Sequence, residues 1–134
     1  MTKSDRENWK KRKDFESQNI DAEPWQGLAV HSQNTDQHEF VKFALCFLLD
    51  SKGRAWDSEV QFPDGRVDVL DLGPDDGKPI VYEVETGVTA KRAREKVEQY
   101  NIGPVRDVLV IDPADVPRDI TEAIEYLDST HVLG

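Results

Sequence analysis

Three carboxylates on two strand-like segments are the side chains of this sequence best suited to do chemistry. Glu83 and Glu85 lie two positions apart in the apolar segment 80–86, so the two-residue period of a strand places both on one face. Asp68 lies in the preceding apolar segment, 66–72. Like charges on a covered face repel each other and lose hydration unless a cation lies between them. Because carboxylate oxygens suit Mg²⁺ or Mn²⁺ better than zinc, the three acids predict a divalent-cation site.

An exposed acidic surface is the alternative interpretation of these acids. The chain has 134 residues, with 17 Lys and Arg against 27 Asp and Glu, which gives a formal net charge of −10. Asp outnumbers Glu 16 to 11. Such a surface is typical of proteins from salt-loving organisms, in which molar salt shortens the Debye length to ~3 Å. The charge excludes a general attraction of the whole chain to polyanions, so any contact with nucleic acid has to be local.

The first element expected to position the acids is a helix over residues 36–50. Its apolar residues recur at helical spacing with almost no polar gap, so we expect the helix to be buried along most of its length. Asp36 and Glu39 have the spacing of a capping box at its start. The side chains expected to be largely inaccessible to solvent include Phe43, Cys46 and Phe47.

Three strands are expected after this helix. Alternating polarity at residues 56–62 and 66–72, separated by turn residues, predicts a hairpin, and residues 80–86 predict a third strand. Further along the chain the expected elements are, in order, a helix capped by Thr89 that ends near residue 103, a buried strand over residues 105–112, a helix from about residue 117, and an edge strand over residues 131–133.

This order of elements, with an acid in the second strand and Glu-x-Glu in the third, resembles the PD-(D/E)XK nuclease superfamily over residues 36–112. The resemblance implies an α/β fold of the restriction endonuclease-like or Holliday junction resolvase-like kind, with an αβββαβ core and a mixed central sheet flanked by helices. It also implies that Mg²⁺ or Mn²⁺ is held by Asp68, Glu83 and the Val84 carbonyl. The positions that correspond to the family's acids are Glu39 on the first helix, Asp68 in Gly65-Arg66-Val67-Asp68-Val69, and Glu83 in Glu83-Val84-Glu85.

Glu85 replaces the lysine of the family's Glu-x-Lys motif. In the family this lysine orients or activates the attacking water, so Glu85 is expected to act as a general base or as a second-metal ligand. Alternatively, Lys91, Arg94 or Lys96 on the next helix supplies the positive charge. Glu39 is either a capping residue of its helix or an outer catalytic acid that reaches the metal through water.

Cations on the helix that follows the third strand are candidates for contacts with DNA. Four cations within six residues stand out in an acidic chain and could bind phosphates beside the metal site. A solvated helix face explains them equally well. His38 and His31 are candidate proton donors or phosphate contacts, or else exposed polar histidines. The residues predicted to contact DNA are Lys91, Arg92, Arg94, Lys96 and Gln99.

Together these features predict a divalent-metal-dependent DNA endonuclease. A chain of this length has little room for a sequence-reading domain, so we expect cleavage that is selective for branched, flapped or single-stranded DNA. Symmetric cutting of two strands would need a homodimer. The alternative is a catalytically inactive, nuclease-like module that binds DNA or serves in assembly, of viral or halophilic origin, and the loss of the family lysine favours it.

The chain is expected to form one domain of residues 34–134 behind an N-terminal basic extension of residues 1–33. The first 13 residues carry six cations and two acids, which suits a nucleic-acid arm or a solvated tail. No apolar segment is long enough for a membrane span or a signal peptide. The single cysteine, Cys46, fits a reducing compartment, so a cytoplasmic location without membrane contact is expected.

Overall fold

A computed structural model of the chain describes residues 3–16, 25–30, 33–74 and 77–131. None of the helices in these ranges is both long and apolar enough to cross a membrane. The elements, in chain order, are α1 (Lys3–Glu16), α2 (Asp36–Ser51), β1 (Trp56–Phe62), β2 (Gly65–Asp71), β3 (Ile80–Val84), α3 (Ala90–Tyr100), β4 (Asp107–Ile111), a short 3₁₀ helix η1 (Pro113–Asp115) and α4 (Ile120–Thr130).

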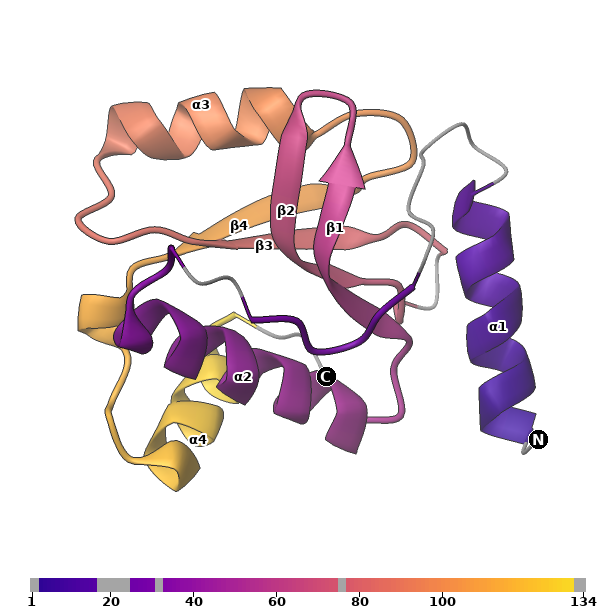
Figure 1. Cartoon of the computed structure of the whole chain (residues 1–134), viewed down its shortest axis with the longest axis horizontal. Coiled ribbons are helices and arrows are strands. Elements are labelled where there is room, and N and C mark those ends of the chain that lie inside the picture. Colours follow the sequence, from indigo (N-terminus) through magenta and orange to yellow (C-terminus); the bar gives the residue numbers. More distant parts are fainter. Residues whose placement is uncertain (1–2, 17–24, 31–32, 75–76, 132–134) are drawn as a thin grey trace.

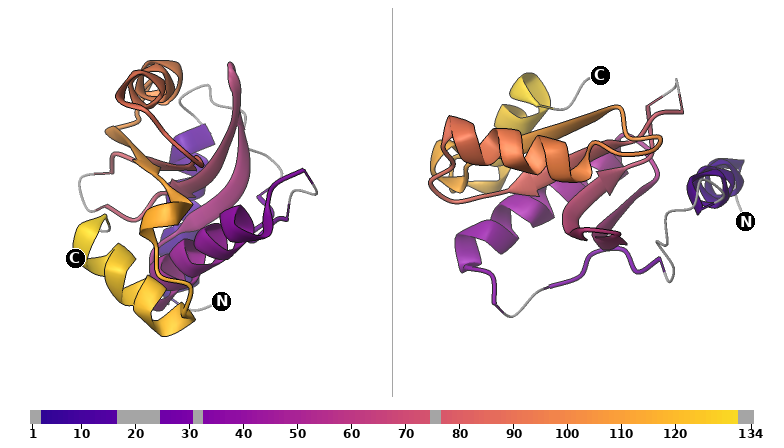
Figure 2. Two further views of the ribbon diagram at one scale, coloured as in Figure 1. Left: turned by 90° about the vertical axis from the view of Figure 1, so that its left-hand side faces the viewer. Right: turned by 90° about the horizontal axis from the view of Figure 1, so that it is seen from above.

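A four-stranded mixed sheet forms the centre of the molecule, in the order β1-β2-β3-β4. The first three strands pair antiparallel, and β3 pairs with β4 in parallel. Helices α2 and α4 lie together on one side of the sheet and α3 lies on the other (Figures 1 and 2). The prediction of an α/β fold with a mixed sheet flanked by helices is therefore confirmed.

Two apolar cores cover the two faces of this sheet. Val69 and Tyr82 belong to the core shared with α2 and α4, whereas their neighbours Leu70 and Val81 belong to the core that includes Tyr100 of α3. Strands buried on both faces have few positions for polar side chains. A charged residue inside β2 or β3 therefore needs a partner.

The pairing of β2 with β3 ends halfway along β2. The paired residues are Val69 with Tyr82, Leu70 with Val81 and Asp71 with Ile80. Toward its start β2 pairs with β1 alone, and the β1–β2 hairpin rises away from β3 and β4 (Figure 1). The sheet thus forks at Asp68, the first residue of β2 beyond the paired region.

The start of α2 differs by one residue from the expected capping box. Thr35 is the N-cap, and its hydroxyl accepts a hydrogen bond from the His38 N–H at 3.1 Å. The expectation that Glu39 caps the helix on Asp36 is wrong. The Glu39 carboxylate therefore takes part in other contacts, which are described below.

The outer face of α2 is more exposed than its composition predicts. Cys46 is buried, but Phe43 and Phe47 are 43% and 54% exposed, so their expected burial is wrong. One face of α2 packs on the sheet and another on α4. Phe43 and Phe47 lie on the remaining face, which no described element covers. The two rings contact each other there, with centroids 6.3 Å apart.

Part of the N-terminal segment packs on the domain. Phe15 of α1 is buried, with its ring centroid 6.1 Å from that of Phe62 and 6.0 Å from that of Trp25. The Arg12 guanidinium also donates to the Trp56 carbonyl at 2.9 Å. The expected edge strand at residues 131–133 lies outside the described residues, apart from His131 at the end of α4.

Candidate functional site

Asp68 and Glu83 meet at the fork of the sheet. Both residues are buried, with 9% of Asp68 and 3% of Glu83 exposed, and their carboxyl groups are hydrogen-bonded to each other. The Val84 N–H donates to Asp68 Oδ2 at 2.8 Å, so this side chain continues the contact between β2 and β3 beyond their last backbone pair. The structure therefore brings together the two acids that the strand period and the hairpin predict to be neighbours.

The two carboxyl groups differ in protonation because they share a buried position. Burial, followed by the hydrogen bond to Asp68 and its negative charge, raises the pKa of Glu83 to about 10. Burial also acts against ionisation of Asp68, but hydrogen bonds from His38, Glu83 and the Val84 N–H lower its pKa. At neutral pH the pair therefore holds one proton and one negative charge. Glu83 Oε1 is buried and has no hydrogen-bond partner.

Glu85 follows β3, pairs with cations of α3, and its negative charge acts to raise the pKa of Glu83. Its carboxylate pairs with Arg92 Nε at 2.9 Å and with Lys96 Nζ at 3.6 Å. The Lys96 ammonium also lies 5.6 Å from the centroid of the Tyr100 ring, and its charge acts to lower the pKa of Glu83. Of the three cations proposed to replace the family lysine, Lys96 is the one that the structure places beside the acids, whereas Lys91 and Arg94 are exposed on α3.

Gln99 connects α3 to the β1–β2 turn. Its side-chain amide donates to the Asp64 carbonyl at 2.6 Å and to the Tyr100 hydroxyl at 3.1 Å. Gly65 passes so close to this contact that an added Cβ would lie 2.6 Å from the Tyr100 hydroxyl. The structure thus gives Gln99 a role in holding α3 against the hairpin.

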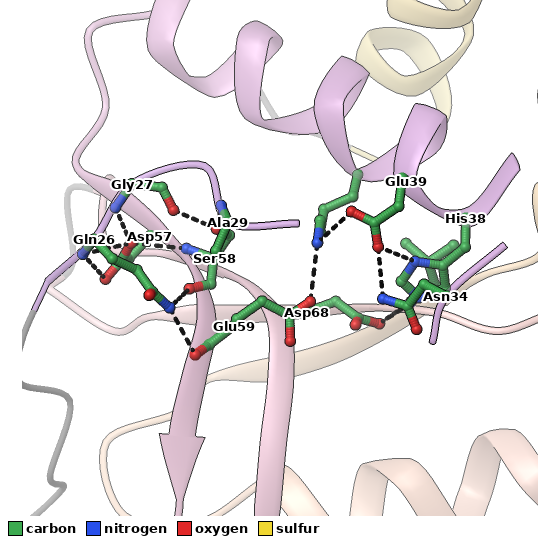
Figure 3. Close-up of polar contacts among 12 residues, drawn as sticks. Gln26, Gly27, Ala29, Asn34, His38, Glu39, Asp57, Ser58, Glu59 and Asp68 are labelled. Atoms are coloured by element: carbon green, nitrogen blue, oxygen red, sulfur yellow. Dashed lines mark hydrogen bonds and ion pairs between the residues drawn. The ribbon is translucent and has the colours of Figure 1, made fainter. Parts of the chain in front are cut away.

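His38 is the site residue that the sequence did not place. Its Nε2 lies 3.4 Å from Asp68 Oδ2, and its Nδ1 lies 3.4 Å from Glu39 Oε1 (Figure 3). Burial acts to lower the pKa of His38, but the hydrogen bond and charge of Asp68, together with the charge of Glu39, raise it. The only sequence signal was its position next to Glu39 in the first turn of the helix. His31, the other histidine considered, lies outside the described residues.

Glu39 joins the site from α2 through His38. Its carboxylate accepts a hydrogen bond from Asn34 Nδ2 at 2.6 Å and pairs with Lys42 Nζ at 2.7 Å. Lys42 in turn pairs with Glu59 of β1 at 2.9 Å. Within the described part of the chain, no group of three or more His, Cys, Asp or Glu side chains is already arranged to hold a metal ion.

Comparisons of the chain with protein-family models, with curated proteins and with solved structures found no match.

Proposed function

We propose that this chain is a divalent-metal-dependent DNA endonuclease with a restriction endonuclease-like core of the PD-(D/E)XK kind. The observation that carries the proposal is the buried pair of Asp68 and Glu83 at the fork of the sheet. Two carboxyl groups in contact inside a fold are costly unless a proton or a cation lies between them. The hydrogen bond from the Val84 N–H to Asp68 needs one carboxylate and does not account for the second, and groups with strongly shifted pKa values cluster at functional sites.

The pair fits a hard divalent cation. Glu83 Oε1 is buried without a partner, which leaves one oxygen available to a ligand. Asp68, Glu83 and the Val84 carbonyl would supply an all-oxygen set, which suits Mg²⁺ or Mn²⁺. A cation would replace the shared proton as the charge that separates the carboxylates. Such an ion, when bound, would polarise a phosphate oxygen and lower the pKa of a bound water.

The neighbouring residues suit the remaining tasks of phosphodiester hydrolysis. Glu85 would accept a proton from water or bind a second metal ion. The ammonium of Lys96, 3.6 Å from Glu85, brings a positive charge from α3 where the family has a lysine on the strand. His38 and Glu39 approach Asp68 from α2, which allows Glu39 to act as an outer ligand through water.

The remaining cations of α3 suit contacts with a phosphate backbone. Lys91, Arg92 and Arg94 are exposed on the helix that carries Lys96. Contacts of this kind orient a nucleic acid without reading its sequence. We therefore propose that the enzyme recognises the structure of its DNA substrate, which is branched, flapped or single-stranded. A homodimer would cut two strands symmetrically.

The test is cleavage of labelled linear duplex, single-stranded, flapped and four-way-junction DNA with Mg²⁺ or Mn²⁺, at low and at molar salt. The wild type is expected to cut at least one form, and Asp68→Asn is expected to abolish cutting. Asp64→Asn, the same change in the adjacent turn, is the matched control and should retain activity. Cleavage that persists in Asp68→Asn at the wild-type rate would contradict the proposal.

A catalytically inactive DNA-binding or assembly module is the second candidate. The observation that favours it is Glu85, which stands in the lysine position and is held by Arg92 and Lys96. This candidate predicts that the wild type leaves every DNA form intact with both metals and still binds DNA. Its binding should weaken with rising salt and with Lys91→Ala or Arg94→Ala, because phosphate contacts release counterions.

A further inference from the structure

Lys42 is a charged side chain with no access to solvent. It is 0% exposed, and its ammonium lies 2.7 Å from Glu39 Oε2 and 2.9 Å from Glu59 Oε1. The desolvation of a buried ion pair often offsets its Coulomb attraction, so apolar residues of similar volume usually give the same stability or more. Stability alone therefore does not explain an ammonium at this position.

Glu59 has a backbone conformation that side chains rarely adopt. Its φ is 52°, the single positive value at a non-glycine residue in the described ranges. The residues on either side of it pair regularly with β2, Ser58 with Val69 and Val60 with Val67, but Glu59 itself makes no such pair with Asp68 opposite. A non-glycine residue keeps a positive φ only where contacts with the surrounding structure enforce it, and such residues cluster at functional sites.

The segment of residues 26–29 provides that surrounding structure. The Gln26 side-chain amide donates to the carbonyls of Ser58 at 3.0 Å and Glu59 at 3.2 Å, and the Ala29 N–H donates to Ser58 Oγ at 2.7 Å. The Gly27 N–H donates to the carboxylate of Asp57 at 2.6 Å. Figure 3 shows these contacts on the β1 side of the site. They fix the irregular part of β1 and with it the direction of the Glu59 side chain.

The contacts continue from Lys42 to the buried acid pair. Glu39 lies between Lys42 on one side and His38 on the other, and His38 lies 3.4 Å from Asp68 Oδ2. A series of ionisable side chains thus runs from β1 across α2 to the fork of the sheet. Each group limits the position of the next, because the Lys42 side chain has no access to solvent and only 7% of the Glu59 side chain and 12% of the His38 side chain are exposed.

We propose that Glu59 and Lys42 are positioning residues that hold Glu39, and through it His38, against Asp68. The inference rests on the proposed function, because it assigns these residues to the support of the proposed metal site. It extends that function to two residues on elements outside the motif, one of them on β1. Partners bonded directly to a metal ligand typically change metal affinity by about 10- to 100-fold when they are removed, and the more remote Lys42 and Glu59 are expected to act at the lower end of this range.

The test is the affinity of the full chain for Mn²⁺ alone, measured by electron paramagnetic resonance titration. Glu59→Gln, which keeps the size of the side chain and removes its charge, is expected to weaken Mn²⁺ binding by about tenfold or more. Lys42→Met is expected to do the same. Circular dichroism checks that each variant is folded, and Glu59→Gln carries the test if Lys42→Met does not fold.

Asp71→Asn is the matched control. Asp71 is also a buried acid of the hairpin and pairs with a cation, Arg54, at 2.8 Å, but it lies at the other end of β2. Its substitution should lower stability and leave Mn²⁺ affinity unchanged. If Glu59 acts through Glu39, the double variant Glu39→Gln/Glu59→Gln should bind Mn²⁺ no more weakly than Glu39→Gln alone.

The outcomes separate this inference from the proposed function. If the wild type binds Mn²⁺, Asp68→Asn does not, and Glu59→Gln binds as the wild type does, the positioning role is overturned and the proposed function stands. Additive losses in the double variant, or an equal loss in Asp71→Asn, also overturn the positioning role. A wild type that binds no Mn²⁺ overturns both.

Discussion

Replacing Glu83 by glutamine should stabilise the metal-free protein in a pH-dependent way. In the folded chain burial and Asp68 raise the pKa of Glu83 from 4.5 to about 10, whereas in the unfolded chain the group ionises normally. The folded state therefore binds one more proton between these two values, and its stability falls as the pH rises through them. The glutamine amide resembles the protonated carboxyl and can still donate to Asp68, so it removes this penalty.

The size of the gain follows from the same linkage. Between pH 4.5 and pH 7 the raised pKa of Glu83 lowers the free energy of unfolding by about 1.4 kcal/mol for each pH unit. This gives an upper bound of about 3 kcal/mol for the loss at pH 7. Asp68 contributes in the opposite sense, because its pKa is lowered on folding and its contribution is present above its unfolded pKa. We therefore expect a measurable gain below that bound at pH 7 and almost none at pH 4.5.

The assay is urea unfolding of wild type and Glu83→Gln in the presence of EDTA at pH 4.5, 6 and 7.5. Glu85→Gln is the control: its ion pairs with Arg92 and Lys96 are partly exposed and screened by solvent, so this variant should lose a little stability and gain none. A Glu83→Gln variant that is less stable than the wild type at pH 7.5, or whose gain is the same at all three pH values, would show that Glu83 is not held protonated by burial beside Asp68.

Three further predictions concern packing and reactivity. Phe47→Ala should lower the free energy of unfolding in urea by less than about 1 kcal/mol because the ring is half exposed, whereas Leu45→Ala, at a buried position of the same helix, should lower it by about 2–5 kcal/mol. Equal losses in the two variants would contradict the exposed face of α2. The Cys46 thiol, whose pKa burial raises to about 12, should not react with a disulfide reagent at pH 8 until urea unfolds the chain, and rapid labelling of the native protein would place Cys46 elsewhere. Gly65→Ala should destabilise the protein by more than about 1 kcal/mol, the usual cost of a strained backbone conformation, because φ is +147° at this residue and the new Cβ would meet the Tyr100 hydroxyl. Unchanged stability would mean that α3 does not approach the hairpin.

The parts of the fold that follow from local rules could be predicted from the sequence. The hairpin and the third strand follow from alternation and turn residues, and Thr89 caps α3 as expected, with its hydroxyl accepting from the Arg92 N–H. The meeting of Asp68 and Glu83 follows from the same rules, because adjacent antiparallel strands with a fixed side-chain period leave few alternatives.

The features that depend on tertiary contacts could not be predicted. The exposure of Phe43 and Phe47 depends on where α4 packs, which the sequence of α2 alone does not specify. The approach of His38 to Asp68 depends on the rotation of α2 about its axis. The conformation of Glu59 depends on hydrogen bonds from residues 26–29, which are about 30 positions away in the chain. No local pattern records such contacts.

The position of a bound metal ion would show whether Asp68 and Glu83 together hold a divalent cation. Crystals of the wild type soaked in Mn²⁺ would be measured by anomalous diffraction, which locates manganese independently of any interpretation of the site. We expect an anomalous peak between Asp68 and Glu83, within about 2.5 Å of an oxygen of each carboxylate. A peak elsewhere, or a carboxyl pair that still shares its proton in saturating Mn²⁺ at pH 8, would contradict it.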